Sequence, residues 1–316
     1  MLSLEDILAP VGRERFFAEY YRKKPLHLPA AGARADIFSV ADLDRLVSQA
    51  SLWTEQTLKM WVDRAPVPQD QIFASVQSLE GVVRRPDPAR VEAQFARGAS
   101  IVLNETENTT PSLRAVANVL EEAFLGFASA NIYCSRGGRQ AFDSHYDDHE
   151  VFAFHIAGEK TWRVYEGRID NPVGQPSQRP NLQEMHNKAK GKILFEQVMR
   201  PGDLMYMPRG QYHDALAGAG LSLHVTFSVF PMNGLALFNL MEAASIRDSL
   251  FRDDLPNPDL PGGREALAER LKALGARLAA LAGDPGFLNH VAAAQRGRVR
   301  RRHEASLSAA SESEDG

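Results

Sequence analysis

The amino-acid sequence predicts a mainly β core with α/β elements before it and a helical region after it. Three observations support this fold class. Between about residues 129 and 230, short strand-like segments follow one another with turn signals and no helical pattern between them, which is typical of an antiparallel sandwich or barrel. Before residue 129 helical and strand patterns alternate, and from about residue 234 the apolar residues recur at helical spacing.

The N-terminal region, residues 1–128, is expected to pack on the core. Ser3, followed three residues later by Asp6, predicts a helix start. This helix is expected to run to about Tyr20, before the breaking signal of Pro25. Apolar spacing predicts further helices over 40–47 and 111–127, and strands over 58–62 and 101–104.

The core, residues 129–231, is predicted to consist of strands joined by tight turns. Gly137-Gly138 and Ala157-Gly158-Glu159 supply two of these turns. A stretch rich in Pro, Gln and Asn, residues 171–191, is expected to form a surface loop near the site. The predicted strands are 131–134, 150–156, 160–165, 192–198, 204–207 and 221–227.

The C-terminal region, residues 232–304, is predicted to be helical over 235–251 and 265–282, and residues 305–316 are expected to be disordered. The apolar residues of these helices could pair two copies of the chain across a dimer, the alternative being packing against the chain's own core. They are Leu237, Leu240, Met241, Leu267, Leu271, Leu274, Leu278 and Leu281.

Composition describes an ordinary soluble globular protein, with 24% charged and 44% hydrophobic residues among 316. A net charge of -4 gives no global nucleic-acid signature. The basic run 296–303 could contact RNA or an acidic protein, but such runs are more often solvated helix ends, so direct nucleic-acid binding is not expected. The single Cys134 favours a reducing compartment, and the absence of a secretory or membrane pattern predicts a cytoplasmic protein.

Two histidines and one aspartate predict a metal site. His145 and Asp147 stand two residues apart, so in an extended segment both side chains point to the same side. His213 follows sixty-eight residues after His145 and completes a two-histidine, one-carboxylate set. Such a set suits ferrous iron, because three protein ligands leave positions for a chelating cosubstrate and dioxygen.

The His-x-Asp triplet alone is weak evidence, because a histidine in a strand is more often a hydrogen-bonded core or surface residue than a ligand. The context of His213 strengthens it. The spacing Gly202, five residues, Pro208, one residue, Gly210, two residues, His213 is similar to the second sequence motif of the cupin superfamily. His224 is an alternative ligand, but this motif favours His213.

Several segments together resemble the JmjC-type ribosomal oxygenases, which are Fe(II)- and 2-oxoglutarate-dependent protein hydroxylases. The resemblance implies a double-stranded β-helix, the cupin or JmjC jelly roll, with Fe(II) as cofactor and 2-oxoglutarate and dioxygen as cosubstrates. It also implies a C-terminal dimerisation region followed by a winged helix, and the residues after Phe230 fit the former better than the latter. The segments are 131–133, 144–148, 158–165, 201–204, 222–226 and, more loosely, 15–28.

The resemblance implies that Lys160, fifteen residues after His145, binds the far carboxylate of 2-oxoglutarate. Burying that charge in a barrel is costly unless a cation meets it. The alternative is a surface lysine in a turn. The resemblance also implies that Asn131, Ser222 and Thr226 contact the cosubstrate, and that Tyr133, His155 and His224 line the substrate site or support it. His155 stands where many relatives carry glutamine.

The expected function is hydroxylation of a side chain of a protein substrate, with an arginine or histidine of a ribosomal protein favoured over lysine demethylation. The open alternatives are another peptide, a small molecule, or a metal-binding cupin without oxygenase activity. Lys160 separates the last alternative from the others, because a scaffold cupin has no need of a 2-oxoglutarate site.

Overall fold

The computed structural model describes residues 2–79, 81–138, 142–174 and 181–300. The chain divides into two compact units, residues 1–230 and 231–300, which are described separately. Residues 305–316, expected to be disordered, lie outside the described part of the chain. None of the described helices is long and apolar enough to cross a membrane.

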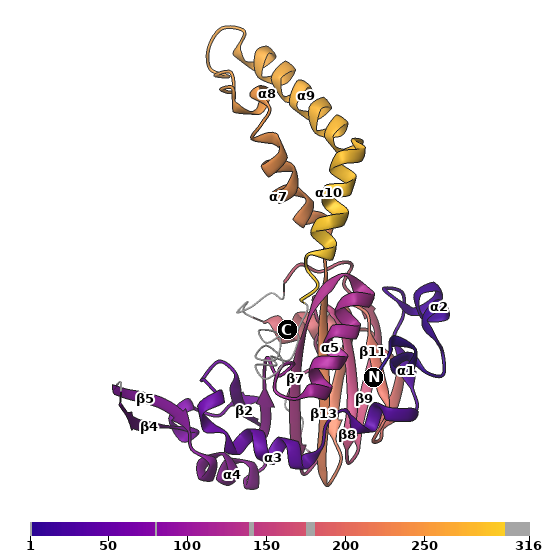
Figure 1. The fold of residues 1–316 in the computed structure, drawn as a ribbon, viewed down its shortest axis with the longest axis vertical. Helices are drawn as coiled ribbons and strands as arrows, with labels where there is room; N and C mark the ends of the chain where they lie inside the picture. Colours follow the sequence, from indigo (N-terminus) through magenta and orange to yellow (C-terminus); the bar gives the residue numbers. More distant parts are fainter. Residues whose placement is uncertain (1, 80, 139–141, 175–180, 301–316) are drawn as a thin grey trace, which may run out of the picture. The chain divides into compact units, whose positions relative to one another are not determined.

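The first unit is built on two sheets, and it confirms the prediction of a mainly β core with helical regions (Figure 1). The larger sheet has eight strands in the order β1 (Leu26–Leu28), β11 (Leu204–Met207), β8 (Glu150–Ala157), β13 (Leu221–Pro231), β7 (Gly126–Arg136), β6 (Ser100–Leu103), β2 (Leu58–Val62) and β3 (Ala65–Pro66). The smaller sheet has the order β10 (Ile193–Met199), β9 (Lys160–Arg168) and β12 (Gln211–Ala217). The chain passes from β8 in the larger sheet to β9 and β10 in the smaller sheet and returns to the larger sheet at β11. It then crosses to the smaller sheet again at β12 and back at β13. This is the winding of a double-stranded β-helix.

Strand β8 shows why the sheet has two buried faces. Phe152 and Phe154 belong to the large apolar cluster shared with the N-terminal elements, whereas Val151 and Ala153 pack with Trp162 of the smaller sheet. This alternation follows from the two-residue period of a strand. Side chains of the odd-numbered set therefore face the space between the two sheets.

Helix α5 (Pro111–Phe124) packs along β7 and covers the apolar face of the larger sheet (Figure 1). Thr110 caps its N-terminus by accepting a hydrogen bond from the Leu113 amide, and Pro111 occupies the first turn. The helix is terminated by Leu125, which has a left-handed backbone, and β7 begins at Gly126. The expected helix end at residue 127 was therefore too late.

The prediction of one N-terminal helix that runs to Tyr20 is wrong, because the segment is not a continuous helix. Ser3 and Asp6 do form the expected capping box, but α1 (Leu4–Leu8) ends before Pro10, whose ring disfavours helical backbone at Ala9. The chain then forms α2 (Arg13–Arg15) and a π-helical turn, η1 (Phe16–Tyr20).

The remaining elements of the first unit surround the sheets. The β4–β5 hairpin and α4 were not predicted (Figure 1). Neither was α6, which lies inside the stretch expected to be a surface loop. These elements are η2 (Gly32–Ile37), α3 (Val40–Ser48), η3 (Ala50–Leu52), η4 (Gln69–Gln71), β4 (Phe73–Ser78), β5 (Gly81–Pro86), α4 (Pro88–Ala96) and α6 (Leu182–Ala189).

The second unit is helical, with α7 (Gly234–Ser245), α8 (Ser249–Arg252), α9 (Gly263–Ala282) and α10 (Pro285–Arg296). The helix expected over 235–251 is divided in two, because Asp248 caps a new helix by accepting from the Leu250 amide. The apolar residues that were expected to pair helices are not fully buried within the described chain, and Leu271 is 54% exposed.

Candidate active site

His145, Asp147 and His213 come together at the point where two segments of the barrel meet. His145 and His213 form an isolated antiparallel bridge, with amide-to-carbonyl hydrogen bonds of 3.0 and 2.9 Å in the two directions. The amide of Gly210 donates to the carbonyl of Asp147 over 2.8 Å. Backbone pairing therefore fixes the two segments relative to each other before any ion binds.

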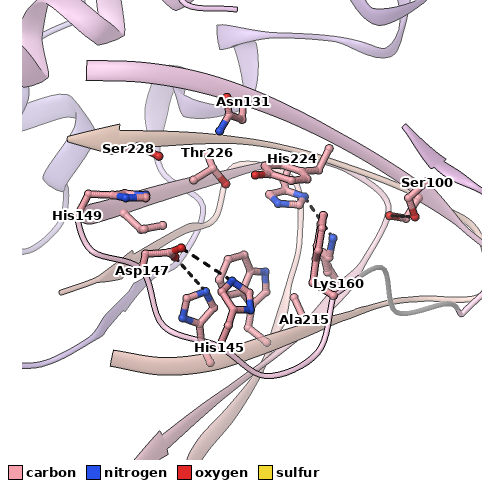
Figure 2. Close-up of a pocket in the computed structure, with 16 residues that line it drawn as sticks. Ser100, Asn131, His145, Asp147, His149, Lys160, Ala215, His224, Thr226 and Ser228 are labelled. Carbon is pink, nitrogen blue, oxygen red and sulfur yellow. Dashed lines mark hydrogen bonds and ion pairs between the residues drawn. The ribbon is translucent and has the colours of Figure 1, made fainter. Parts of the chain in front are cut away.

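The donor atoms of the three side chains lie close together, and Figure 2 shows His145 and Asp147 on the same side of the cavity. Asp147 Oδ2 lies 3.5 Å from His213 Nε2, and Asp147 Oδ1 lies 3.9 Å from His145 Nε2. One donor atom from each residue lies within 4.8 Å of the other two. This is a donor set of two imidazoles and one carboxylate, and it comes from one side of the cavity.

Both imidazoles are oriented by backbone carbonyls. His145 Nδ1 lies 2.8 Å from the carbonyl of Asp143, and His213 Nδ1 lies 3.0 Å from the carbonyl of Gln211. A carbonyl oxygen only accepts, so each Nδ1 carries the proton and each Nε2 presents its lone pair to the site. Burial lowers the pKa of His213 to about 4, with His145 acting in the same direction, so this imidazole is neutral and suited to bind a metal.

The donor set opens into a cavity of about 280 Å³ between the two sheets. Its wall includes Asn131 and Tyr133 from β7, Lys160 from β9, and His224 and Thr226 from β13. These are five of the seven residues that were predicted to line the site beside the metal ligands. Strands from both sheets thus contribute to one compartment.

Lys160 is the cation of this cavity. Its side chain is only 6% exposed, and its Nζ lies 3.5 Å from His224 Nδ1 (Figure 2). Burial lowers the pKa of Lys160 to about 8. Burial, followed by the charge of Lys160, also lowers the pKa of His224 well below its usual value. His224 is therefore a neutral acceptor for the ammonium, and no carboxylate among the described residues forms an ion pair with Lys160.

Aromatic stacking holds the cavity walls in place. The Tyr133 ring stacks on His224 with centroids 4.8 Å apart, and the Trp162 ring stacks on the ligand His213 at 5.5 Å. Burial raises the pKa of Tyr133 to about 12, so its hydroxyl stays protonated and available as a hydrogen-bond donor.

Ser222 and His155 are the two predicted residues that do not line the cavity. Both are buried: Ser222 Oγ has no hydrogen-bond partner among the described atoms, and His155 Nε2 bonds the carbonyl of Gly158 at 2.9 Å. His155 is paired in register with His224 on β13. It therefore lies beside a wall residue of the cavity, on the same face of the sheet.

Several wall residues were missed, although alternation along the strands would have found most of them. His149 follows Asp147 by two residues, Trp162 follows Lys160, Ala215 follows His213, and Ser228 follows Thr226. Ser135 likewise follows Tyr133 by two residues on β7, whereas Ser100 and Phe142 carry no such signal. Ser100 reaches the wall because β6 pairs with β7, where its hydroxyl bonds Ser135 at 2.9 Å.

Behind the metal ligands, an aromatic cluster ties helix α6 to the site. Tyr146 and Tyr212 each adjoin a ligand in sequence, point away from the cavity by alternation, and pack on each other at 5.4 Å. His186 of α6 contacts both rings, and its Nδ1 lies 2.9 Å from the Tyr212 hydroxyl. The helix within the expected loop therefore covers the outer side of the ligand pair.

Residues 103–237 match the family described as the JmjC domain. This part of the chain is a JmjC domain. The matched range contains all three candidate metal ligands and Lys160, and it covers β7 to β13 with the start of α7. The JmjC domain predicted from the sequence motifs is confirmed over this range.

Curated relatives with this JmjC domain are larger proteins. Ribosomal oxygenase 1 of Gallus gallus is 30% identical over 260 residues, which are 79% of this chain and 41% of that protein. The bifunctional lysine-specific demethylase and histidyl-hydroxylase NO66 of Drosophila grimshawi is 29% identical over 241 residues, 76% of this chain and 32% of that protein. The chain thus spans less than half the length of these relatives.

Among solved structures, the chain shares its fold with the ribosomal oxygenase YcfD of Escherichia coli in complex with cobalt and 2-oxoglutarate. The TM-score is 0.52 at 14% sequence identity, with 87% of this chain and 68% of that chain covered. A YcfD complex with cobalt and succinic acid gives a TM-score of 0.51 at 15% identity, with 83% of this chain and 66% of that chain covered. At this identity the likeness supports the double-stranded β-helix fold.

Proposed function

We propose that this chain is an Fe(II)- and 2-oxoglutarate-dependent oxygenase that hydroxylates a side chain of a protein substrate. One observation carries the proposal: the two-histidine, one-aspartate donor set and a buried lysine without a carboxylate partner among the described residues line one cavity. A scaffold cupin explains the donor set but gives no reason to bury Lys160, because an uncompensated ammonium destabilises the fold.

The residues present fit a ferrous ion, because the donor atoms are two neutral imidazole nitrogens and a carboxylate oxygen on one side of an open cavity. When bound, the iron supplies the activation of dioxygen, coupled to oxidative decarboxylation of 2-oxoglutarate to succinate, that makes an unreactive C–H bond accessible to hydroxylation. His145, Asp147 and His213 would hold the ion, and the carbonyls of Asp143 and Gln211 orient the imidazoles of the two histidines.

Lys160 would neutralise the far carboxylate of the cosubstrate, and Asn131 and Thr226 would supply polar contacts along the cavity wall. Ser222 is a weaker candidate for this role because it does not line the cavity. Tyr133 and His224, stacked on each other, would fix the position of the cosubstrate and separate it from water. His155 would support His224 from the neighbouring strand.

Within protein substrates, a histidine side chain fits the described cavity better than an arginine. The only carboxylate among the residues that line it is Asp147, which is a candidate metal ligand. A guanidinium would therefore lack an acidic partner, whereas an imidazole can bond a neutral hydroxyl such as that of Ser228. NO66 is named a histidyl-hydroxylase and its relative in Gallus gallus a ribosomal oxygenase, which makes a ribosomal protein the favoured source of the histidine.

The test is 2-oxoglutarate turnover with separate His145→Ala and Asp147→Ala variants and, as a matched control, His290→Ala on an exposed part of α10. We expect substrate-dependent succinate formation, followed by NMR, to fall at least about 100-fold in the first two and to stay unchanged in the control. Undiminished succinate formation in either ligand variant would overturn the assignment.

We further propose that residues 232–304 form a dimerisation region, that residues 1–128 support the catalytic core 129–231, and that the protein works in the cytoplasm. Apolar residues of the second unit support the first point, because an open groove lined by Leu237, Met241 and Leu278 lies between its helices. The single buried Cys134 agrees with a reducing compartment.

A further inference from the structure

A second recess of the first unit is lined by several positively charged side chains. Its volume is about 500 Å³, and it is lined by Arg22, Lys23 and Arg168 together with Asp170, Asn171 and the rings of Phe17 and Tyr21. Arg22, Lys23 and Arg168 are exposed. The recess shares no lining residue with the candidate active site.

The cations here are held by neutral oxygen atoms. Arg22 Nη2 and Arg209 Nη2 both donate to Asn171 Oδ1, over 3.0 and 2.7 Å. Arg168 donates to the carbonyls of Arg209 and Lys23, over 3.0 and 3.1 Å. Two guanidinium groups on one amide oxygen repel each other, and an anion placed between them would relieve that repulsion.

Negative charge is sparse near the four cations of this cluster, which are the three in the recess and Arg209. None of the four forms an ion pair with a carboxylate in the described ranges. Three acidic groups are near them. Glu19 pairs with Arg15 and Lys24, which are not part of the cluster. Asp170 lines the recess and its carboxylate accepts from the side chain of Asn171, and Glu150 is buried and bonded to Tyr206. The cluster therefore stays positive in a chain whose net charge is -4.

We propose that this recess binds the phosphodiester backbone of a single-stranded RNA segment. Phosphate oxygens match the planar fork of arginine, and three arginines held by neutral acceptors are oriented before the ligand arrives. The rings of Phe17 and Tyr21 line the same recess, although both are partly buried and pack on Phe124. Aromatic rings are the usual companion of a basic groove in single-strand binding.

The sequence around the recess has the same character. The segment from Arg13 to Lys24 contains five basic and four aromatic residues beside two glutamates, and the Arg13 guanidinium lies 5.8 Å from the centroid of the Phe17 ring. The composition of the whole chain predicted no nucleic-acid binding. The local cluster is different because residues from three distant segments, near positions 22, 168 and 209, form it only in the folded chain.

The experiment is fluorescence anisotropy with a labelled twelve-nucleotide single-stranded RNA of mixed sequence, using the full chain. Wild-type binding should weaken with salt at a slope of roughly -3 on logarithmic axes, about -0.7 for each of four neutralised phosphates. The double variant Arg22→Gln/Arg209→Gln should bind at least about tenfold more weakly, and its slope should be shallower by about 1.4. The matched control Arg264→Gln/Lys272→Gln removes the same charge from exposed positions of α9 and should leave both quantities unchanged.

Equal RNA affinity and slope in the recess variant and the wild type, at equal thermal unfolding midpoints, would overturn the proposal. The proposal would also be overturned if a polyglutamate peptide or inorganic phosphate displaced the RNA when its negative groups were present at the same concentration as the RNA phosphates. Either result would indicate a general anion site. The readout is binding alone, so its result is independent of whether the chain hydroxylates a protein.

Discussion

Burying Lys160 serves the proposed function but lowers the stability of the folded protein. Burial lowers its pKa from 10.5 to about 8, which corresponds to a cost of roughly 3 kcal/mol in the folded state. The unfolded chain binds more protons between the two values, so stability rises with pH from about 8 to 10.5, and the cost is fully present below pH 8. A dicarboxylate in the cavity would remove much of that cost.

Lys160→Met should therefore stabilise the ligand-free protein while weakening its cosubstrate binding. We expect the thermal unfolding midpoint at pH 7 to rise by several degrees, since each kcal/mol shifts it by about 2–4 °C in a chain of this size. The dissociation constant for 2-oxoglutarate, measured by calorimetry, should rise at least about 100-fold. Lys192→Met, at an exposed position, is the control; a Lys160→Met variant that kept wild-type affinity would refute the role of this lysine.

The lowered pKa of Lys160 predicts that 2-oxoglutarate binding depends on pH. Because the ammonium form binds the carboxylate, the dissociation constant for 2-oxoglutarate should be level below about pH 8 and increase about tenfold per pH unit above it. Lys160→Arg should remove this rise, because a guanidinium stays charged throughout the range. A rise that persisted in the arginine variant would have to come from another group.

At the scale of elements, the turn before β12 explains the glycine of the cupin-like motif. Gly210 has φ +85°, and a Cβ there would lie 2.0 Å from the carbonyl oxygen of Ile169. Its amide also donates to the carbonyl of Asp147. The turn thus needs a left-handed backbone and a close approach, both next to a metal ligand.

Gly210→Ala should destabilise the protein by more than the strain of a left-handed alanine backbone alone. Gly174 provides the matched control, because it has φ +74° and a Cβ there would have no described atom within 4 Å. We expect Gly174→Ala to lower the free energy of unfolding by about 1 kcal/mol and Gly210→Ala by several kcal/mol, as measured by urea unfolding. Equal losses in the two variants would contradict the close packing of this turn.

Strand periodicity explains most of what the sequence could predict. The strands of the core, the facing of His145 with Asp147, and the turn before His213 follow from patterns within a few residues. Helix α6 could not be found this way, because its stability depends on His186 packing against Tyr146 and Tyr212, which are distant in sequence. Ser100 was missed for the same kind of reason, because it lines the cavity only through the pairing of β6 with β7.

At the scale of the whole molecule, the apolar surface of the second unit predicts self-association. Leu235 and Phe238 of α7 are 54% and 66% exposed, and Phe238 lines the groove that contains Leu237 and Leu278. We expect light scattering at micromolar concentration to give about twice the chain mass of 34.9 kDa. Leu237→Glu/Leu278→Glu should give the monomer mass and Leu288→Glu on α10 should not; a monomeric wild type would refute the dimer.

Hydroxylation of a protein side chain with 2-oxoglutarate is the reaction proposed for the whole protein. The most direct measurement is the mass of ribosomal proteins from cells that lack this chain, after incubation with the purified protein, Fe(II) and 2-oxoglutarate. One ribosomal protein should gain about 16 Da on a histidine, with one succinate formed per modification, and Lys160→Met should abolish both at the same cosubstrate concentration. Succinate formation without a gain of mass on any of these proteins, or a gain that does not require 2-oxoglutarate, would contradict this function.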